Sequence, residues 1–333
     1  MSPSPRLGFV GLGWIGRMRL DAVAAAGTAQ VAALCDPVAE RLEATATDHD
    51  GSIRLERYEE MVERAEELGL DGLVIATPNA LHLPQTLSAL DRGLAVFCQK
   101  PLGLDAAQVA RQIEAAKSAD RLLGVDLSYR FTRGADELGR ILRTGELGEL
   151  LHVEAVFHNA YGPDKSWCFD PAMAGGGALM DLGVHLLDLV LHLLTPEDGP
   201  PPQIVQASGR SWPEADPIDR FTTARLLLDS GVPVHLAVSW EAHTGRDCDF
   251  RLHVHGSRGG ACLRNVGGSF YDFELARFDG RSERVTAREQ GGWLDRGILD
   301  WTRRLGRSHR YDPEIERSLP VARALDAVYG RTG

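Results

Sequence analysis

Short apolar runs alternate with helical segments throughout residues 6–127, and this alternation is the feature that most restricts the fold. Strands are expected at 7–10, 31–35, 72–76, 95–98 and 122–126. Helical spacing is found between them, at 14–26, 37–47, 58–68, 81–92 and 105–118. Strands that alternate with helices at this spacing form a parallel sheet covered on both faces. We therefore expect a doubly wound α/β domain over residues 1–127.

The pattern changes in residues 128–333. We expect a helix at 133–143, a strand at 151–157 and a helix at 178–194. A series of strand-like runs follows them. These runs lie at 203–210, 219–228, 232–240, 248–256, 260–264 and 269–278. Strands that follow one another without helices form an antiparallel or mixed sheet, so an α+β second domain is expected. A last helix is expected at 314–329. Packing of this helix against the first domain is one alternative, and the pattern does not decide it.

The composition narrows the class of partner. Lys and Arg number 36 against 47 Asp and Glu, a net charge of −11, which argues against nucleic acid and anionic membranes. No apolar stretch follows a basic start, and the polar residues within 178–194 exclude a membrane span. Five cysteines without a Cys-x-x-Cys pair argue against a disulfide framework. A cytoplasmic location is expected.

A glycine-rich turn follows the first expected strand and opens the first helix. Its residues are predicted to bind a dinucleotide and are Gly11, Gly13, Trp14, Ile15 and Gly16. The glycines permit a tight turn, close approach of the pyrophosphate and packing of helix on strand. The helix N-terminus supplies N–H donors to the phosphates. Asp36 ends the second strand, 20 residues after Gly16, where a ribose-binding acid is expected.

Asp36 also bears on the choice of cofactor. A carboxylate accepts a hydrogen bond from the 2′-hydroxyl of NAD and repels the 2′-phosphate of NADP. Arg41, about one turn into the next helix, weakens this inference. NAD is therefore expected, with NADP as the alternative.

The helix at 178–194 is apolar nearly all round, which is typical of a buried helix. Its polar residues Asp181, His185, Asp188 and His192 fall within about 60° of one another on a helical wheel. Buried charge is costly unless it is paired or used, so this stripe is a candidate for chemistry. A structural Asp–His hydrogen bond is the alternative for Asp181 and His185. Asp188 and His192 are interpreted as structural partners.

The chain resembles the Gfo/Idh/MocA family of glucose–fructose oxidoreductases and inositol dehydrogenases over nearly its whole length. The resemblance rests on the glycine turn, Ala76–Asn79 with His82, Gln99–Pro101, Tyr129–Phe131, and Gly175–Gly177 followed by Asp181 and His185. It implies a Rossmann domain joined to an α/β domain whose large open sheet mediates a homodimer or homotetramer. Some relatives with this fold have lost catalysis.

The resemblance also implies roles for single residues. Lys100, Asp181 and His185 match catalytic positions. Cofactor-binding positions match Thr77, Pro78, Asn79, His82 and Gln99. Arg130 matches a position near cofactor or substrate. The family's usual Glu is replaced by Gln99, whose amide can still bond a ribose hydroxyl. This replacement removes an anion next to Lys100, which favours the uncharged amine.

Hydride transfer from a carbinol carbon explains this set of residues. Histidine titrates near neutral pH, so His185 suits general acid–base work, with Asp181 orienting it or binding the substrate hydroxyl. Lys100 would place positive charge at the reacting oxygen. A metal site on the helical stripe is an alternative, but the reaction requires no metal and none is expected. His158 and Trp167, from an irregular segment, are expected at the substrate, where an aromatic ring suits a sugar face.

The predicted function is therefore an NAD-dependent dehydrogenase acting on CH–OH groups of a cyclitol, sugar or sugar derivative. Two alternatives remain: an NADP-dependent keto-sugar reductase in biosynthesis, and a non-catalytic dinucleotide-binding regulator. The expected partner is a small polyol or sugar.

Overall fold

The computed structural model describes residues 4–214 and 216–331, which form two compact units. The first unit runs to Asp126 and also takes in residues 295–316. The second unit spans 127–294 and resumes at Arg317. The segment that returns to the first unit is thus 295–316, whereas the helix at the C-terminus belongs to the second unit. The sequence pattern instead predicts a single domain boundary after residue 127.

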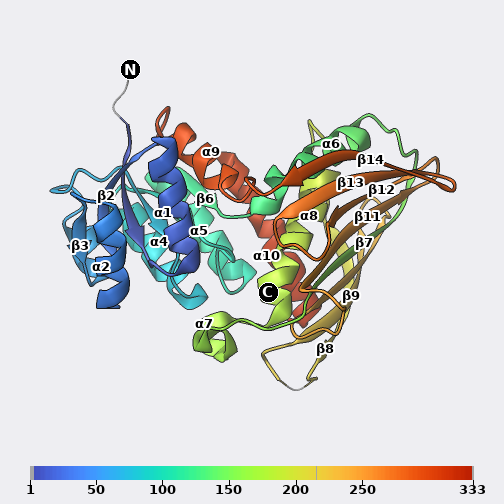
Figure 1. Ribbon diagram of the computed structural model, residues 1–333, viewed down its shortest axis with the longest axis horizontal. Helices are drawn as coiled ribbons and strands as arrows, with labels where there is room; N and C mark the ends of the chain where they lie inside the picture. The colour runs from blue at the N-terminus through green and yellow to red at the C-terminus, as the bar shows by residue number, and fades with distance from the viewer. Residues whose placement is uncertain (1–3, 215, 332–333) are drawn as a thin grey trace. The chain divides into compact units, whose positions relative to one another are not determined.

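The first unit is built on six parallel strands in the order β3-β2-β1-β4-β5-β6. The strands are β1 Arg6–Val10, β2 Gln30–Cys35, β3 Ile53–Leu55, β4 Gly72–Ile75, β5 Ala95–Cys98 and β6 Leu123–Val125. This order, with a crossover helix after most strands, is that of a dinucleotide-binding Rossmann sheet. The predicted doubly wound fold is confirmed (Figure 1).

Helices cover this sheet. They are α1 Trp14–Ala26, α2 Ala39–Asp48, α3 Tyr58–Glu63, η1 Asn79–Leu81, α4 His82–Asp91, α5 Ala106–Ala119 and α9 Arg296–Leu305, followed by η5 Pro313–Arg317. A buried cluster joins Leu20 of α1, Leu42 of α2 and Trp301 of α9 to the strands. The sequence pattern did not predict α9, although its apolar residues at 298, 301 and 305 have helical spacing. Strand β3 is only three residues long, which is too short to be recognised by alternation.

The second unit holds an eight-stranded sheet in the order β14-β13-β12-β11-β7-β10-β9-β8. The strands are β7 Leu150–Asn159, β8 Ile204–Trp212, β9 Phe221–Leu228, β10 Pro233–Ser239, β11 Cys248–Gly256, β12 Gly260–Asn265, β13 Asp272–Asp279 and β14 Ser282–Gln290. All neighbours are antiparallel except β7 and β10. The predicted mostly antiparallel sheet is confirmed. Strand β14 was missed because it is polar and largely exposed.

One face of this sheet is covered by helices. The helices of this unit are η2 Ser128–Phe131, α6 Arg133–Arg143, η3 Ser166–Phe169, α7 Pro171–Ala174, η4 Leu179–Gly183, α8 Val184–Leu194 and α10 Ser318–Tyr329. Helices α6, α8 and α10 contact the strands directly (Figure 1). Buried and exposed residues alternate along β9 accordingly, which shows that its other face is open.

The predicted helix at 178–194 is not a continuous α-helix. Residues Leu179–Gly183 form a π-helical turn, and regular α-helix begins at Val184. A π turn carries an extra residue and is frequent at functional sites. It also shifts Asp181 relative to the α-helical wheel used for the prediction. The stretch Pro171–Leu194 is apolar and long enough to cross a membrane, but 78% of its most apolar window is buried, as in a core helix.

Candidate active site

The glycine turn of the first unit lies between β1 and α1. Gly11 has φ +83°, and a Cβ there would lie 2.5 Å from the Ala76 carbonyl oxygen. A Cβ on Gly16 would lie 1.9 Å from the Gly11 carbonyl oxygen, so both positions require glycine. Gly13 begins α1 without a side-chain cap among the described residues, and a Cβ there would meet nothing within 4 Å. The backbone is therefore open at the helix N-terminus, as phosphate binding requires.

Asp36 is fixed against this turn. Its carboxylate accepts hydrogen bonds from Leu12 N at 2.7 Å and from Val38 N at 2.9 Å, and the residue is only 3% exposed. The Arg41 guanidinium lies 4.0 Å from the same carboxylate and is largely exposed. The predicted ribose-binding acid is thus held at the end of β2, with a cation at its side. Trp14, also predicted here, is 59% exposed on the first turn of α1, and Ile15 beside it is half-buried.

His82 has a different place from the one expected. Its ring nitrogens lie 2.7 Å from the Pro101 carbonyl oxygen and 2.9 Å from the Thr77 carbonyl oxygen, and its side chain is fully buried. Burial lowers the pKa of His82, and the hydrogen bonds to the two backbone carbonyls oppose that shift. Direct contact with a cofactor does not fit this burial. The ring instead joins the loop that carries Thr77, Pro78 and Asn79 to the loop that carries Lys100.

Gln99 belongs to a buried polar network. Its amide nitrogen donates to the Asp126 carboxylate, which also accepts from Arg19 Nε at 2.5 Å. Arg19 and Asp126 are 1% and 2% exposed, and Gln99 is 7% exposed. An ion pair this deeply buried persists only when its hydrogen bonds are satisfied. A carboxylate is therefore present beside position 99, but on Asp126, at the carboxyl end of β6. The amide at Gln99 suits this neighbour, whereas a Glu would place two buried acids together.

In the second unit, Asp219 fixes the backbone that leads into the π turn. Its carboxylate accepts from Gly177 N at 2.9 Å, Leu179 N at 2.8 Å and Tyr329 Oη at 2.8 Å, and the residue is 1% exposed. Its own carbonyl accepts from Ala178 N at 2.7 Å. These bonds satisfy the N–H groups that a helix start leaves without intrahelical partners. Sequence reasoning missed Asp219 because its partners Gly177 and Leu179 lie 42 and 40 residues away and Tyr329 lies 110 residues away.

Asp181 and His185 each contact an aromatic side chain of the second unit. The Asp181 carboxylate accepts from Trp240 Nε1 at 3.0 Å, just beyond the end of β10. The His185 ring packs edge-on against Tyr129, with the ring centroids 4.9 Å apart. Tyr129 is buried and stacks on Phe250 with centroids 4.8 Å apart. Both predicted catalytic side chains are half-buried and held by aromatic rings.

The rest of the predicted stripe is structural in its contacts. Asp188 is 1% exposed, and its carboxylate accepts hydrogen bonds from Nε and Nη2 of Arg130. Burial raises the pKa of Asp188, and Arg130 opposes that rise. Burial and then Arg130 lower the pKa of His192 to about 4, so this ring is neutral at pH 7. Arg130, which is expected near cofactor or substrate, donates hydrogen bonds from its guanidinium to Asp188.

The two residues expected to contact the sugar, His158 and Trp167, lie in different parts of the second unit. Phe157 contacts Tyr129 on the helix-covered face, and adjacent residues of a strand point to opposite faces. His158 therefore lies on the open face, where its Nδ1 is 2.7 Å from Ser239 Oγ and its ring stacks on Phe221. This removes His158 from the face that carries Asp181. Trp167 is half-buried in η3, the turn whose last residue, Phe169, meets the Trp240 ring at 5.9 Å.

The Gln99 network yields a pH-dependent prediction. Gln99→Glu should reduce the free energy of unfolding by about 1–3 kcal/mol at about pH 7.5, because a second buried carboxylate would face Asp126. Repulsion raises the pKa of the new acid in the folded state, so folding takes up a proton as the pH falls. The loss should therefore shrink towards about pH 5.5. Urea unfolding followed by fluorescence measures it.

Gln99→Met is the matched control, since it also loses the bond to Asp126 but adds no charge. Its loss of stability, relative to the unchanged protein, should be equal at both pH values. Equal losses for both variants at both pH values would contradict a carboxylate conflict at this position.

Comparison with known proteins places this geometry in a family. Residues 5–127 match the family model described as "Oxidoreductase family, NAD-binding Rossmann fold", and residues 136–262 match the "GFO/IDH/MocA C-terminal domain". The chain is 37% identical over 214 residues to a protein of Amycolatopsis mediterranei named "Putative UDP-kanosamine synthase oxidoreductase subunit", covering 59% of this chain and 58% of that one. It is 28% identical over 295 residues to an inositol 2-dehydrogenase of Saccharopolyspora erythraea, covering 82% and 84%.

Solved structures agree on the fold over the whole chain. The 3-ketoreductase KijD10 of Actinomadura kijaniata, crystallised with NADP and TDP-benzene, superposes with a TM-score of 0.84 at 21% identity, covering 98% of both chains. An aldose–aldose oxidoreductase of Caulobacter crescentus, crystallised with glycerol, gives 0.84 at 22% identity over 99% and 97%. With models of both domains matched in order along the sequence, the chain belongs to the Gfo/Idh/MocA oxidoreductase family.

Proposed function

We propose that this protein is an NAD-dependent dehydrogenase that transfers a hydride between nicotinamide and a secondary alcohol or ketone of a cyclitol, sugar or sugar derivative. The observation that carries the proposal is Asp36, which is locked to the backbone of the glycine turn at the end of β2. The names of the similar proteins, an inositol 2-dehydrogenase and a subunit of a UDP-kanosamine synthase, support the substrate class.

The residues of the first unit fit a dinucleotide. The open backbone at Gly13 would receive the pyrophosphate, and the Asp36 carboxylate would accept a bond from the ribose hydroxyl. The loops that carry Thr77 and Lys100 are held together through His82, which would keep their positions fixed relative to the bound cofactor. When bound, the nicotinamide supplies or accepts the hydride.

The protein's own groups would manage the proton and the charge. In alcohol oxidation, His185 would take the hydroxyl proton at its imidazole, and in ketone reduction it would return that proton. The Lys100 ammonium would stabilise the partial negative charge that develops on the reacting oxygen. Asp181, held by Trp240, would bind the substrate hydroxyl or orient His185. These three assignments are the centre of the proposal.

A second candidate is reduction of a keto-sugar with NADP. It is favoured by Arg41, whose guanidinium lies 4.0 Å from Asp36 and is exposed, as contact with a 2′-phosphate would need. The crystallised 3-ketoreductase contains NADP, so the cofactor of the second candidate is found in a protein with this fold. We rank it second because the buried carboxylate of Asp36 would repel the same phosphate.

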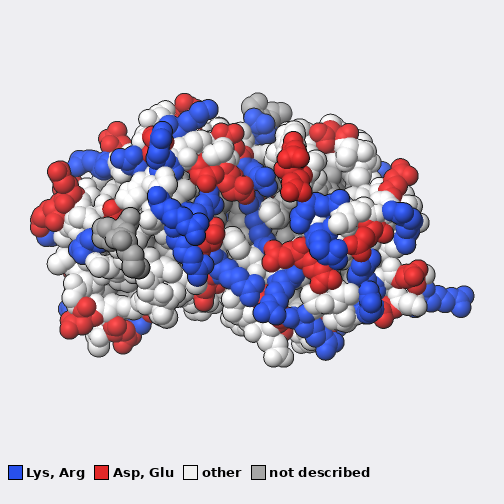
Figure 2. Space-filling model, turned by 90° about the horizontal axis from the view of Figure 1, so that it is seen from above, with Lys and Arg blue, Asp and Glu red and all other residues white. Residues whose placement is uncertain are grey.

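We further propose a cytoplasmic homodimer or homotetramer that associates through the open face of the second unit's sheet. An open face eight strands wide is a large surface to leave in water. Acidic and basic side chains are interspersed over the face shown in Figure 2. This fits a small-molecule substrate better than a polyanionic partner.

The proposal is tested by mixing the protein with NAD or NADP and a panel of inositols, sugars and nucleotide sugars, and following NADH or NADPH absorbance. We expect turnover of at least one polyol or sugar, with kcat/KM higher for NAD. The reverse assay uses the reduced cofactors and keto-sugars. Tight dinucleotide binding with no turnover in either direction would instead indicate a non-catalytic regulator.

The cofactor assignment predicts the effect of Asp36→Asn. The amide removes the charge and keeps one acceptor oxygen, so one of the two backbone N–H bonds is retained and the other is lost. Without the charge, kcat/KM for NADP relative to NAD should rise at least about tenfold. Steady-state kinetics with both cofactors measures the ratio. Glu40→Gln, a charge removal on the exposed first turn of α2, should leave the ratio unchanged. An unchanged ratio in Asp36→Asn would remove Asp36 from cofactor selection.

The catalytic assignment predicts that Lys100→Ala and His185→Ala each lower kcat by about 10²–10⁴-fold, because each removes a group that acts in the transition state. Dinucleotide affinity, measured by fluorescence titration, should stay within about threefold. Lys117→Ala and His243→Ala change exposed residues of the same types and serve as controls. Either active-site variant retaining full turnover would take that residue out of the mechanism.

A further inference from the structure

Four histidines of three adjacent strands gather on the open face of the second sheet. They are His152 of β7, His235 of β10, and His253 and His255 of β11. The ring centroids of His152 lie 4.5 Å from those of His235 and 5.6 Å from those of His255. The rings of His253 and His255 stack with centroids 3.8 Å apart. None of these residues has a part in the proposed hydride transfer.

Strand register explains the cluster. His152 lies directly opposite His255 in the antiparallel β7–β11 pair. Glu154, two residues along β7 and therefore on the same face, lies opposite His253 on one side and His235 on the other. Opposed residues have Cβ atoms only about 4.5–5.5 Å apart, so their side chains meet. The sheet thus presents one carboxylate surrounded by imidazoles.

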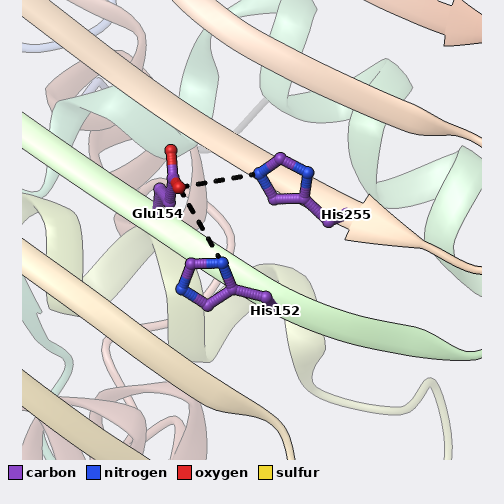
Figure 3. A group of neighbouring side chains, drawn as sticks. All are labelled: His152, Glu154 and His255. Atoms are coloured by element: carbon purple, nitrogen blue, oxygen red, sulfur yellow. Dashed lines mark ion pairs between the residues drawn. The ribbon is translucent and has the colours of Figure 1, made fainter.

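Three of these side chains converge, as Figure 3 shows. Glu154 Oε1 lies 3.9 Å from His152 Nδ1 and 4.0 Å from His255 Nε2, and the three ligand atoms lie within 4.8 Å of one another. Among the described residues, buried His255 Nε2, the nitrogen that faces Glu154, has no hydrogen-bond partner. A buried polar nitrogen without a partner is costly, which points to a ligand at this place.

We propose that His152, Glu154 and His255 form a Zn²⁺ site on the open face of the sheet, with the fourth coordination position open. Two imidazoles and one carboxylate are a ligand set that zinc accepts in tetrahedral sites. At bond lengths of about 2.0–2.1 Å, tetrahedral ligand atoms lie about 3.4 Å apart. The carboxylate–imidazole distances therefore need to close by about half an ångström, and the imidazole–imidazole distance, which is at most 4.8 Å, by at most about 1.4 Å, through side-chain rotation.

The site is independent of the candidate catalytic residues. Asp181 and His185 belong to the helices that cover the opposite face, since Phe157 contacts Tyr129 there while His152 and Glu154 have the other parity along β7. Sequence analysis expects no metal, and the zinc proposed here takes no part in the hydride transfer. Its effect would be to tie β7 to β11 at the middle of the sheet.

The test uses the tag-free, EDTA-treated protein and Zn²⁺ in isothermal titration calorimetry. We expect one saturable zinc per chain, together with a rise in melting temperature, because a ligand that binds the folded state stabilises it. His152→Ala and His255→Ala should each weaken binding by more than about 100-fold, and Glu154→Gln by about tenfold. Co²⁺ in place of Zn²⁺ should show the visible absorption of tetrahedral coordination.

His243→Ala is the control, since it removes an exposed histidine of the same unit and should leave zinc affinity unchanged. Circular dichroism and the melting temperature without metal establish that each variant is folded. Absence of saturable binding, or equal affinity in the folded cluster variants and in the control, would overturn the proposal. Oxidoreductase activity does not enter the test, so its outcome is separate from that of the proposed function.

Discussion

The carboxylate of Asp219 is the group on which the second unit's candidate chemistry depends. It binds two backbone N–H groups ahead of the π turn and the hydroxyl of Tyr329, while its own carbonyl holds a third N–H. A Cβ on Gly177 would lie 1.9 Å from the Asp219 carbonyl oxygen, so glycine and aspartate are matched at this contact. The turn that presents Asp181 is thus positioned by residues distant in sequence, from the start of β9 and the end of α10.

Burial decides which polar residues are available for chemistry. Asp126 and Asp188 are both 1–2% exposed and each is satisfied by an arginine, Arg19 and Arg130 respectively. Such pairs contribute little net stability but are costly to break, because removal of one partner leaves a buried charge. Asp181 is different, since it is half-buried and accepts a hydrogen bond from the indole N–H of Trp240. A half-buried carboxylate is better suited to a substrate than one enclosed by guanidinium.

The large sheet separates two kinds of site by the alternation of its side chains. Inward residues such as Phe157 and Phe250 pack around Tyr129 and support His185. Outward residues on the same strands bring His152, Glu154 and His255 together. A change of one residue in register would exchange these two faces. The π turn and the strand register together therefore determine what each face of the second unit can bind.

The sequence alone determined the Rossmann half, because its signals are local: the glycine turn, Asp36 at a strand end and the alternation of strands and helices are each confined to a short segment. It also determined the buried helix and the antiparallel character of the second sheet. Tertiary structure decided what depends on distant pairing. His82 is enclosed between two loops, Arg130 is held by Asp188, His158 faces away from Asp181, and α9 returns to the first unit. These outcomes could not be predicted from local patterns because the partner of each group lies elsewhere in the chain, and only the register of the strands and the packing of the helices bring the two together.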